Sequence, residues 1–207
     1  MGNRTLGLDP QVATGADNRD DDDVPGPWGV TPLKAGDRIV TTVTKDWDPL
    51  TVETTPEIFV NGRTLADVEN DLNTRDEWGQ GGGGIPQGPV VPFGTSPTVS
   101  IDLKGKFVRI LPTWRQYGSA SAAAKAEWDQ MVAQLTIHED RHVAIAVEEC
   151  DKLATDLVGK EIGQIAGMIT AMGRRIRQRQ DKLDHDTDHG AKVGVQYGDV
   201  KLDTTIK

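Results

Sequence analysis

The feature that most constrains the fold is a long, helix-favouring stretch without proline in the second half of the chain. No proline occurs from Glu127 to Lys207, and Ala, Leu, Gln, Glu, Lys and Arg dominate this region. Apolar residues recur there at intervals of three and four positions, which is the spacing that buries one stripe of a helix. The pattern predicts helical structure from Ser119 to about Leu183.

The part of the chain before this stretch is predicted to contain strands. Residues 38–44 and 50–60 are rich in β-branched side chains, which favour strands. A turn at Asn61-Gly62 follows the second of them. Thr64 is then placed to cap a short helix whose apolar residues share one face.

Two more strands are expected just before the helical region. Residues 98–103 and 106–111 are predicted to pair as a hairpin, with Pro112 ending the second strand. Residues 106–110 are expected at the edge of the sheet beside the first long helix, because proline at 112 suits an edge position. Residues 79–94 are too rich in Gly and Pro for regular structure and are predicted to form a loop.

The order of these elements indicates a mixed α+β fold. Strands come first and helices follow, which argues against alternating strand–helix units. We expect antiparallel strands and hairpins, then a long helix and a second, C-terminal helix. Weak alternation of apolar and polar residues in 191–207 predicts a further edge strand there.

Length and charge indicate one domain with an acidic leader. The chain has 207 residues, and we expect residues 1–35, with the run Asp20–Asp23, to be disordered and residues 36–207 to form the domain. The net charge of −9 argues against nucleic-acid binding, because the chain would repel a polyanion. The sole cysteine, Cys150, excludes an internal disulfide.

The sequence contains no segment that would anchor it to a membrane. No apolar run approaches the ~20 residues needed to cross a bilayer. Residues 1–15 lack the apolar core of a secretory signal. We therefore expect no membrane contact, and on these grounds both export by another route and a cytoplasmic location remain open.

Residues 138–142 read H-E-D-R-H and fit the pattern H-E-x-x-H. On a helix, residues four apart share a face with Cβ atoms roughly 5–6 Å apart, so His138 and His142 can bind one Zn²⁺. Glu139 then lies beside the metal without binding it, and can take a proton from the water that the metal activates. The pattern predicts a zinc site with Glu139 as general base.

A catalytic zinc site also needs a third protein ligand and one open position. A helical hairpin that turns near residue 165 or 166 would bring His189 level with His142. A turn at Gly159 would instead carry His189 ~20 Å too far, unless Gly173 breaks the second helix. We predict His189 as the third ligand. The alternatives that remain open are Glu161, Asp184, His185 and Asp188.

A cluster of four arginines precedes the last two histidines, at positions 174, 175, 177 and 179. The cluster is predicted to be the solvated face of a helix, paired with nearby Asp residues. The alternative is a patch for an anionic substrate or a partner, which four arginines in a chain of net charge −9 support only weakly. We assign it no ligand.

Four motifs together resemble a known bacterial family. They are, in order, Phe59 to Gly62 followed by Thr64-Leu65; Leu111-Pro112-x-Trp114; Trp128 ten residues before H-E-x-x-H; and D-x-x-T-x-H-G from Asp184 to Gly190. Over roughly residues 37–190 the chain thus resembles a family of predicted secreted zinc-dependent proteases that is classified as a domain of unknown function. Leu183 and Arg141 stand where its members usually have Tyr and Gly.

The resemblance implies a zincin-like fold, zinc-dependent peptidase activity and a protein or peptide substrate. Its members are usually exported by a signal peptide, so it also implies a secreted or periplasmic location and contact with export machinery. The alternative is a delivered cargo, an effector or a structural binding protein in which zinc only holds the helices together. Three protein ligands would favour the enzyme, and four the structural protein. Oligomeric state and cleavage preference stay open.

Overall fold

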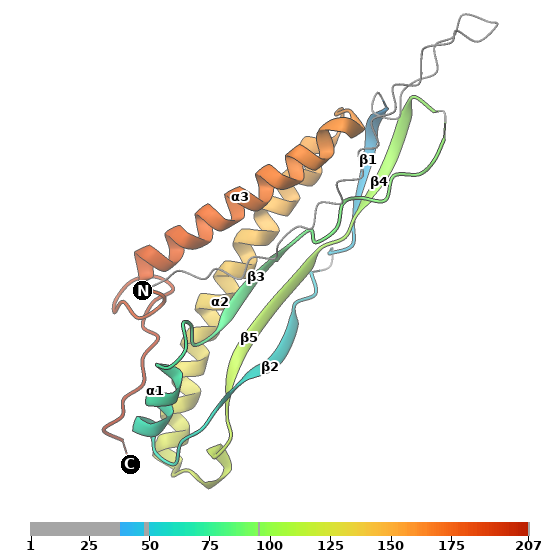
Figure 1. Cartoon of the computed structure of the whole chain (residues 1–207). Helices are drawn as coiled ribbons and strands as arrows, with labels where there is room; N and C mark the ends of the chain where they lie inside the picture. Colours follow the sequence, from blue (N-terminus) through green and yellow to red (C-terminus); the bar gives the residue numbers. More distant parts are fainter. Residues whose placement is uncertain (1–37, 48–49, 95, 207) are drawn as a thin grey trace, which may run out of the picture.

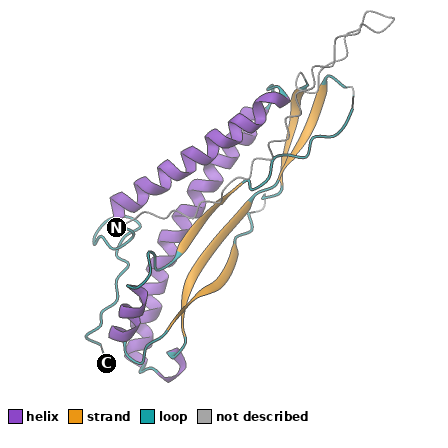
Figure 2. Cartoon of the chain, in the orientation of Figure 1, coloured by secondary structure: helices purple, strands orange, loops and turns teal. Residues whose placement is uncertain are grey.

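The computed structural model describes residues 38–47, 50–94 and 96–206, and the predicted acidic leader at 1–35 lies outside them. Two long helices and a set of strands lie side by side along the length of the molecule (Figure 1). The strands belong to the N-terminal part and the two long helices follow (Figure 2). The fold is therefore the mixed α+β arrangement that the order of elements predicts.

The longest element is helix α2, Ala122–Leu157, and it confirms the helical prediction. Ser121 caps its N-terminus, since the side-chain oxygen accepts a hydrogen bond from the backbone N–H of Ala124. Its 36 residues extend for about 54 Å at the usual helical rise. Helix α3, Ile162–Thr187, packs back along α2 (Figure 1).

The turn between these helices lies at residues 158–161, so the predicted turn near residue 165 or 166 is wrong. Gly159 has a φ of +82°, a left-handed conformation that costs glycine little. The turn is tied to the first strand, because the N–H of Gly159 donates to the carbonyl of Val40 at 2.8 Å. Helix α3 then continues unbroken through Gly173.

Strand β1, Ile39–Lys45, and strand β2, Glu53–Val60, confirm the two predicted N-terminal strands. Helix α1, Leu65–Leu72, follows β2. Its predicted cap is present: the side chains of Thr64 and Asp67 each accept a hydrogen bond from the other residue's backbone N–H. The shared apolar face of α1 is buried, with Leu65, Val68 and Leu72 in it.

The strands form two small sheets, and the predicted hairpin of residues 98–111 is wrong. Strand β4, Thr98–Leu103, pairs in parallel with β1, whereas strand β5, Lys106–Trp114, pairs in parallel with β2. The expectation of antiparallel strands therefore fails for both pairs. The chain passes straight from β4 into β5 at Gly105, where a Cβ would come within 2.7 Å of Phe107 and 2.8 Å of Trp47.

A strand lies within the segment that was predicted to be an irregular loop. Strand β3, Gln80–Gly84, pairs antiparallel with β5. Gly82 and Gly83 have φ values of +151° and +149°, which residues other than glycine rarely adopt. The strand order β2-β5-β3 makes β3 an edge strand, so the prediction of residues 106–110 as the edge is wrong.

Strand β5 continues through Pro112, which was predicted to end it. Its pairing with β3 stops at Ile110, so Pro112 pairs only with Ile58 of β2. Proline lacks an N–H, and it is tolerated at a position where one side of the strand has no ladder to complete.

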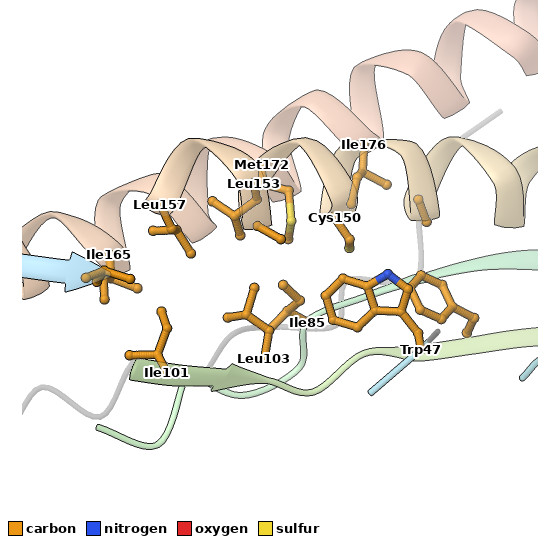
Figure 3. Close-up of a cluster of buried hydrophobic side chains, with 14 of the residues drawn as sticks. Trp47, Ile85, Ile101, Leu103, Cys150, Leu153, Leu157, Ile165, Met172 and Ile176 are labelled. Atoms are coloured by element: carbon orange, nitrogen blue, oxygen red, sulfur yellow. The ribbon is translucent and has the colours of Figure 1, made fainter. Parts of the chain in front are cut away.

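The buried apolar side chains form two clusters that share α2. The first, which we call the hairpin core, lies between the α2–α3 hairpin and β1, β4 and the start of β5 (Figure 3). The second, the α1 core, joins α1 to the N-terminal half of α2 and the end of β5. Leu135 belongs to the α1 core and Val143 to the hairpin core, so residues 136–142 of α2 connect the two.

After α3 the chain returns toward α1 (Figure 1). Val200 and Leu202 are buried in the α1 core, and the N–H of Val200 donates to the carbonyl of Gly190 at 2.9 Å. Residues 191–206 contain turns but no strand, so the predicted edge strand in this segment is wrong.

Candidate metal centre

The two motif histidines lie on one buried face of α2. His138 is 3% exposed and His142 is 7% exposed. Their four-residue spacing brings the two Nε2 atoms to 3.2 Å from each other. Both rings therefore direct a nitrogen at the same small volume.

Asp184 of α3 completes a group of three possible metal ligands. Its Oδ1 lies 3.0 Å from Nε2 of His142 and 3.4 Å from Nε2 of His138. One donor atom from each residue lies within 4.8 Å of the other two. Two imidazoles and a carboxylate are donors of the kind that catalytic zinc sites use.

The C-terminal segment holds the other nitrogen of His138. Nδ1 of this ring lies 3.0 Å from the carbonyl of Tyr197, which can only accept a hydrogen bond. Nδ1 therefore donates, and Nε2 keeps its lone pair for the shared volume. Gly190 packs against the ring, since a Cβ there would lie 3.4 Å from Cγ and Nδ1 of His138. Metal-binding histidines commonly have such a carbonyl partner.

The charges of the three side chains fit a bound cation. Burial opposes ionisation of Asp184, but its hydrogen bonds with His138 and His142 hold the pKa of this carboxyl well below its ordinary value. Burial also opposes charge on His138, yet Asp184 and Glu139 outweigh it and raise the pKa of this imidazole. The site therefore favours a positive charge among these donors, and a proton or a metal ion can supply it.

Glu139 lies beside this group without belonging to it. The side chain is buried, and the pKa of its carboxyl is raised from 4.5 to about 8, mainly by this burial. The negative charges of Glu77 and Asp184 contribute to this raised pKa, whereas His138 acts to lower it. A metal ion bound next to Glu139 would also lower it, because positive charge favours the carboxylate. Such a group can exchange protons near neutral pH.

The edge strand approaches α2 at Glu139. A Cβ at Gly81 would lie 2.2 Å from the carbonyl oxygen of Glu139, and one at Gly79 would lie 2.9 Å from its Oε1. Glycine at these positions is what allows β3 and the segment before it to lie so close to the helix. The edge of the sheet and the candidate general base are thus neighbours.

Sequence reasoning missed two groups at the site, Glu77 and the carbonyl of Tyr197. Glu77 is exposed, but partial removal of its carboxyl from water and the charge of Asp184 raise its pKa, while His142 and His189 lower it. Its carboxyl therefore lies within electrostatic range of these residues. No spacing pattern connects Glu77 with the helix motif, because it arrives on the segment that leads into β3. A backbone carbonyl leaves no signal in the residue types at all.

His189, the predicted third ligand, does not belong to the group of three within the part of the chain that the structure describes. His189 is exposed, and its backbone has the left-handed conformation, with a φ of +53°. Its backbone N–H donates to the carbonyl of Asp184 at 2.8 Å. The turn at Gly159 accounts for this, because it carries His189 beyond His142. Asp184, more than one helical turn earlier, comes level with the histidines instead.

The other alternative ligands lie away from the histidines. Glu161 begins α3 at the hairpin end, at least about 20 Å from His142 by the helical rise between His142 and the end of α2. His185 is exposed and lies 3.6 Å from Oδ1 of Asp186. Asp188 is exposed and ends α3 in the left-handed conformation.

The chain matches a bacterial protein family. The profile described as a bacterial protein of unknown function, DUF922, matches residues 58–190, which include both histidines of α2 and Asp184. No curated protein and no solved structure matches the chain. Among the described helices, none combines the length and the apolar character that spanning a membrane requires.

Proposed function

The chain belongs to the DUF922 family, and we propose that it is a zinc-dependent peptidase with a zincin-like fold. The observation that carries this proposal is the convergence of His138, His142 and Asp184 next to the buried carboxyl of Glu139. Three protein ligands leave a position open, which a catalytic zinc site needs and a closed structural site lacks.

Each residue has a distinct role in this proposal. His138, His142 and Asp184 hold the metal, and the carbonyl of Tyr197 fixes the ring of His138. Bound zinc would polarise the scissile carbonyl and acidify a water molecule. Glu139 takes the proton from that water and afterwards delivers it to the leaving amine.

Strand β3 is the proposed docking edge for a peptide substrate. It pairs with β5 on one side only, and Gly81 to Gly84 carry no side chains that would keep a peptide backbone away. An extended peptide can add to such an edge through main-chain hydrogen bonds. The contact of Gly81 with Glu139 supports this placement, because it brings the added strand close to the general base.

The alternative is a delivered cargo, an effector or a structural binding protein with a purely structural zinc site. Glu77 is the observation that favours it, because a further carboxyl within electrostatic range of His142 and Asp184 could close the coordination sphere.

The proposed location outside the cytoplasm rests on the family resemblance.

The decisive experiment combines metal analysis with hydrolysis of a peptide library by purified protein. We expect one zinc per chain and measurable cleavage. Glu139→Gln should keep the zinc and the melting temperature but lose about 10²-fold or more in rate, because it removes the base without removing a ligand. Asp181→Asn, an exposed acidic position on α3, is the control and should cleave as the parent does.

Two results would contradict the proposal. Cleavage by Glu139→Gln at the parent's rate would exclude Glu139 as the base. A zinc ion bound by Glu77 in addition to the three ligands, together with absent hydrolysis, would support the structural alternative.

A further inference from the structure

The last part of α3 carries Asp184 but contributes no fully buried apolar side chain. The buried residues of α3 are Ile165, Met172, Ile176 and Thr187. No buried apolar side chain therefore follows Ile176 within the helix. Something other than the hydrophobic core has to keep the segment between Ile176 and Asp184 against α2.

A network of charged side chains occupies this position. Glu149 of α2 is only 7% exposed and accepts hydrogen bonds from Nε of Arg175 at 2.7 Å and from Nη1 of Arg179 at 3.0 Å. Glu148 accepts from Nη2 of Arg179 and from Nη1 of Arg141, the latter at 2.7 Å. We call these five residues the arginine clamp.

The clamp connects the two elements that supply the metal ligands. Arg141 directly precedes His142 on α2, and Arg179 precedes Asp184 on α3 by little more than one helical turn. The two other arginines of the predicted basic face, Arg174 and Arg177, are exposed. The prediction of a solvated face thus describes these two, whereas Arg175 and Arg179 contact α2.

Glu149 is the buried charge of the clamp, with 9% of its side chain exposed, whereas the side chains of Arg175 and Arg179 are 36% and 35% exposed. Burial opposes the charge on Glu149, and the hydrogen bonds from Arg175 and Arg179 nevertheless lower the pKa of its carboxyl. The cost of removing ions from water offsets much of their attraction, but a shift of α3 that broke the pairs would leave a buried charge unpaired. The planar guanidinium groups further restrict the allowed orientations.

We propose that Glu149 and Arg179 are positioning residues that set the distance between Asp184 and the two histidines, and thereby the metal affinity of the site. Neither residue belongs to the group of three possible metal ligands. The inference rests on the proposed metal centre, and it identifies the contacts that set the metal affinity of that centre.

The test compares the zinc affinities of Glu149→Gln and Arg179→Met, measured by competition with a chromophoric chelator. Through long-range electrostatics alone, removing the negative charge would weaken cation binding and removing the positive charge would strengthen it. A positioning role predicts weaker binding in both variants, by about 10-fold or more.

Asp151→Asn and Arg177→Met are the matched controls. Asp151 lies on α2 but pairs with Lys45 and Trp47 on the side facing β1, and Arg177 is exposed on α3. They repeat the same charge changes outside the clamp. We expect only small shifts in zinc affinity, in opposite directions.

The melting temperature of each zinc-free protein separates positioning from general stability. Weaker zinc binding at an unchanged melting temperature supports the proposal. Parent-like affinity, opposite shifts like those of the controls, or a loss of affinity that merely follows a loss of zinc-free stability would overturn it. If Glu149→Gln does not fold, the zinc affinity of Arg179→Met tests the proposal by itself. This variant should fold, because the side chain of Arg179 is 35% exposed. If the parent protein binds no zinc, the proposed metal centre itself is wrong. The variants test only the positioning role.

Discussion

A carboxylate as third ligand gives the proposed centre a lower positive charge than a third imidazole would. Asp184 is ionised in its pairing with His138 and His142, and its pKa lies well below the ordinary value. A less positive centre acidifies water less strongly. In the proposed mechanism Glu139 would therefore carry a larger share of the activation, which agrees with its buried position beside the three candidate ligands.

The first prediction concerns the identity of that ligand. Asp184→Ala should lower zinc affinity by more than about 100-fold, since loss of a ligand should cost more than loss of a supporting contact. His189→Ala should have a smaller effect, and the exposed His185→Ala none. Zinc content after dialysis measures all three. Retention of zinc by Asp184→Ala together with its loss from His189→Ala would restore the ligand predicted from sequence.

The second prediction concerns pH and the zinc-free protein. The pKa of Glu139 is raised from 4.5 to about 8, mainly by burial. The stability that this group contributes to the folded state is therefore fully present below pH 4.5 and is lost as pH rises through 8. His138, whose pKa is raised despite burial, acts in the same direction. The melting temperature should therefore fall from about pH 5 to pH 8, and Glu139→Gln should flatten this profile. A parent that becomes more stable over this interval would contradict the assignment.

Helices could be predicted from the sequence more fully than strands and their pairing. The cap of α1 by Thr64 and the four-residue spacing of His138 and His142 on α2 each depend on a single helix, so local sequence patterns are enough to predict them. The direction of pairing between β2 and β5 depends on distant parts of the chain, and strand composition does not encode it. Strand β3 has no side-chain pattern, because backbone pairing with β5 forms it.

The position of the candidate third ligand depends on where the chain turns between α2 and α3, and three glycines are suited to such a turn. Gly159, Gly163 and Gly167 all interrupt the helical pattern. The structure selects Gly159, where backbone hydrogen bonds connect the turn to β1. This tertiary contact has no local signal, and it moves Asp184 rather than His189 to the histidines.

The third prediction tests the contact between β3 and α2. Gly81→Ala would place a Cβ 2.2 Å from the backbone oxygen of Glu139, so either the strand or the helix must move. We expect a loss of about 1–3 kcal/mol in the free energy of unfolding, measured by urea denaturation, with a loss of hydrolysis. Gly88→Ala is the control, because a Cβ there meets nothing within 4 Å. Equal stability of both variants would contradict the close packing.

The candidate metal centre lies where the hairpin core and the α1 core meet. His138 and His142 belong to the stretch of α2 that connects Leu135 with Val143. Asp184 attaches the end of α3 there, and Tyr197 attaches the C-terminal segment that continues into the α1 core. A bound metal would thus hold together parts of the chain that the two cores hold separately.

The fourth prediction follows from this arrangement. Zinc at about 100 times its Kd should add about 2.7 kcal/mol of stability, or about 5–10 °C in Tm. Chelator should also raise hydrogen exchange in residues 177–200 while leaving β1 and β4 protected, because those strands lie in the hairpin core. An equal increase of exchange throughout the chain would contradict this localised effect.

Because α2 passes through both cores, its middle cannot easily change length during evolution. One inserted or deleted residue would rotate one half of the helix by about 100° against the other. Either Trp128 and Leu135 or Val143 and Cys150 would then turn away from their cores. Insertions and deletions among DUF922 relatives should therefore gather in connections such as residues 85–94. The ungapped interval from Trp128 to Cys150 should identify distant relatives in which the rest of the sequence has diverged.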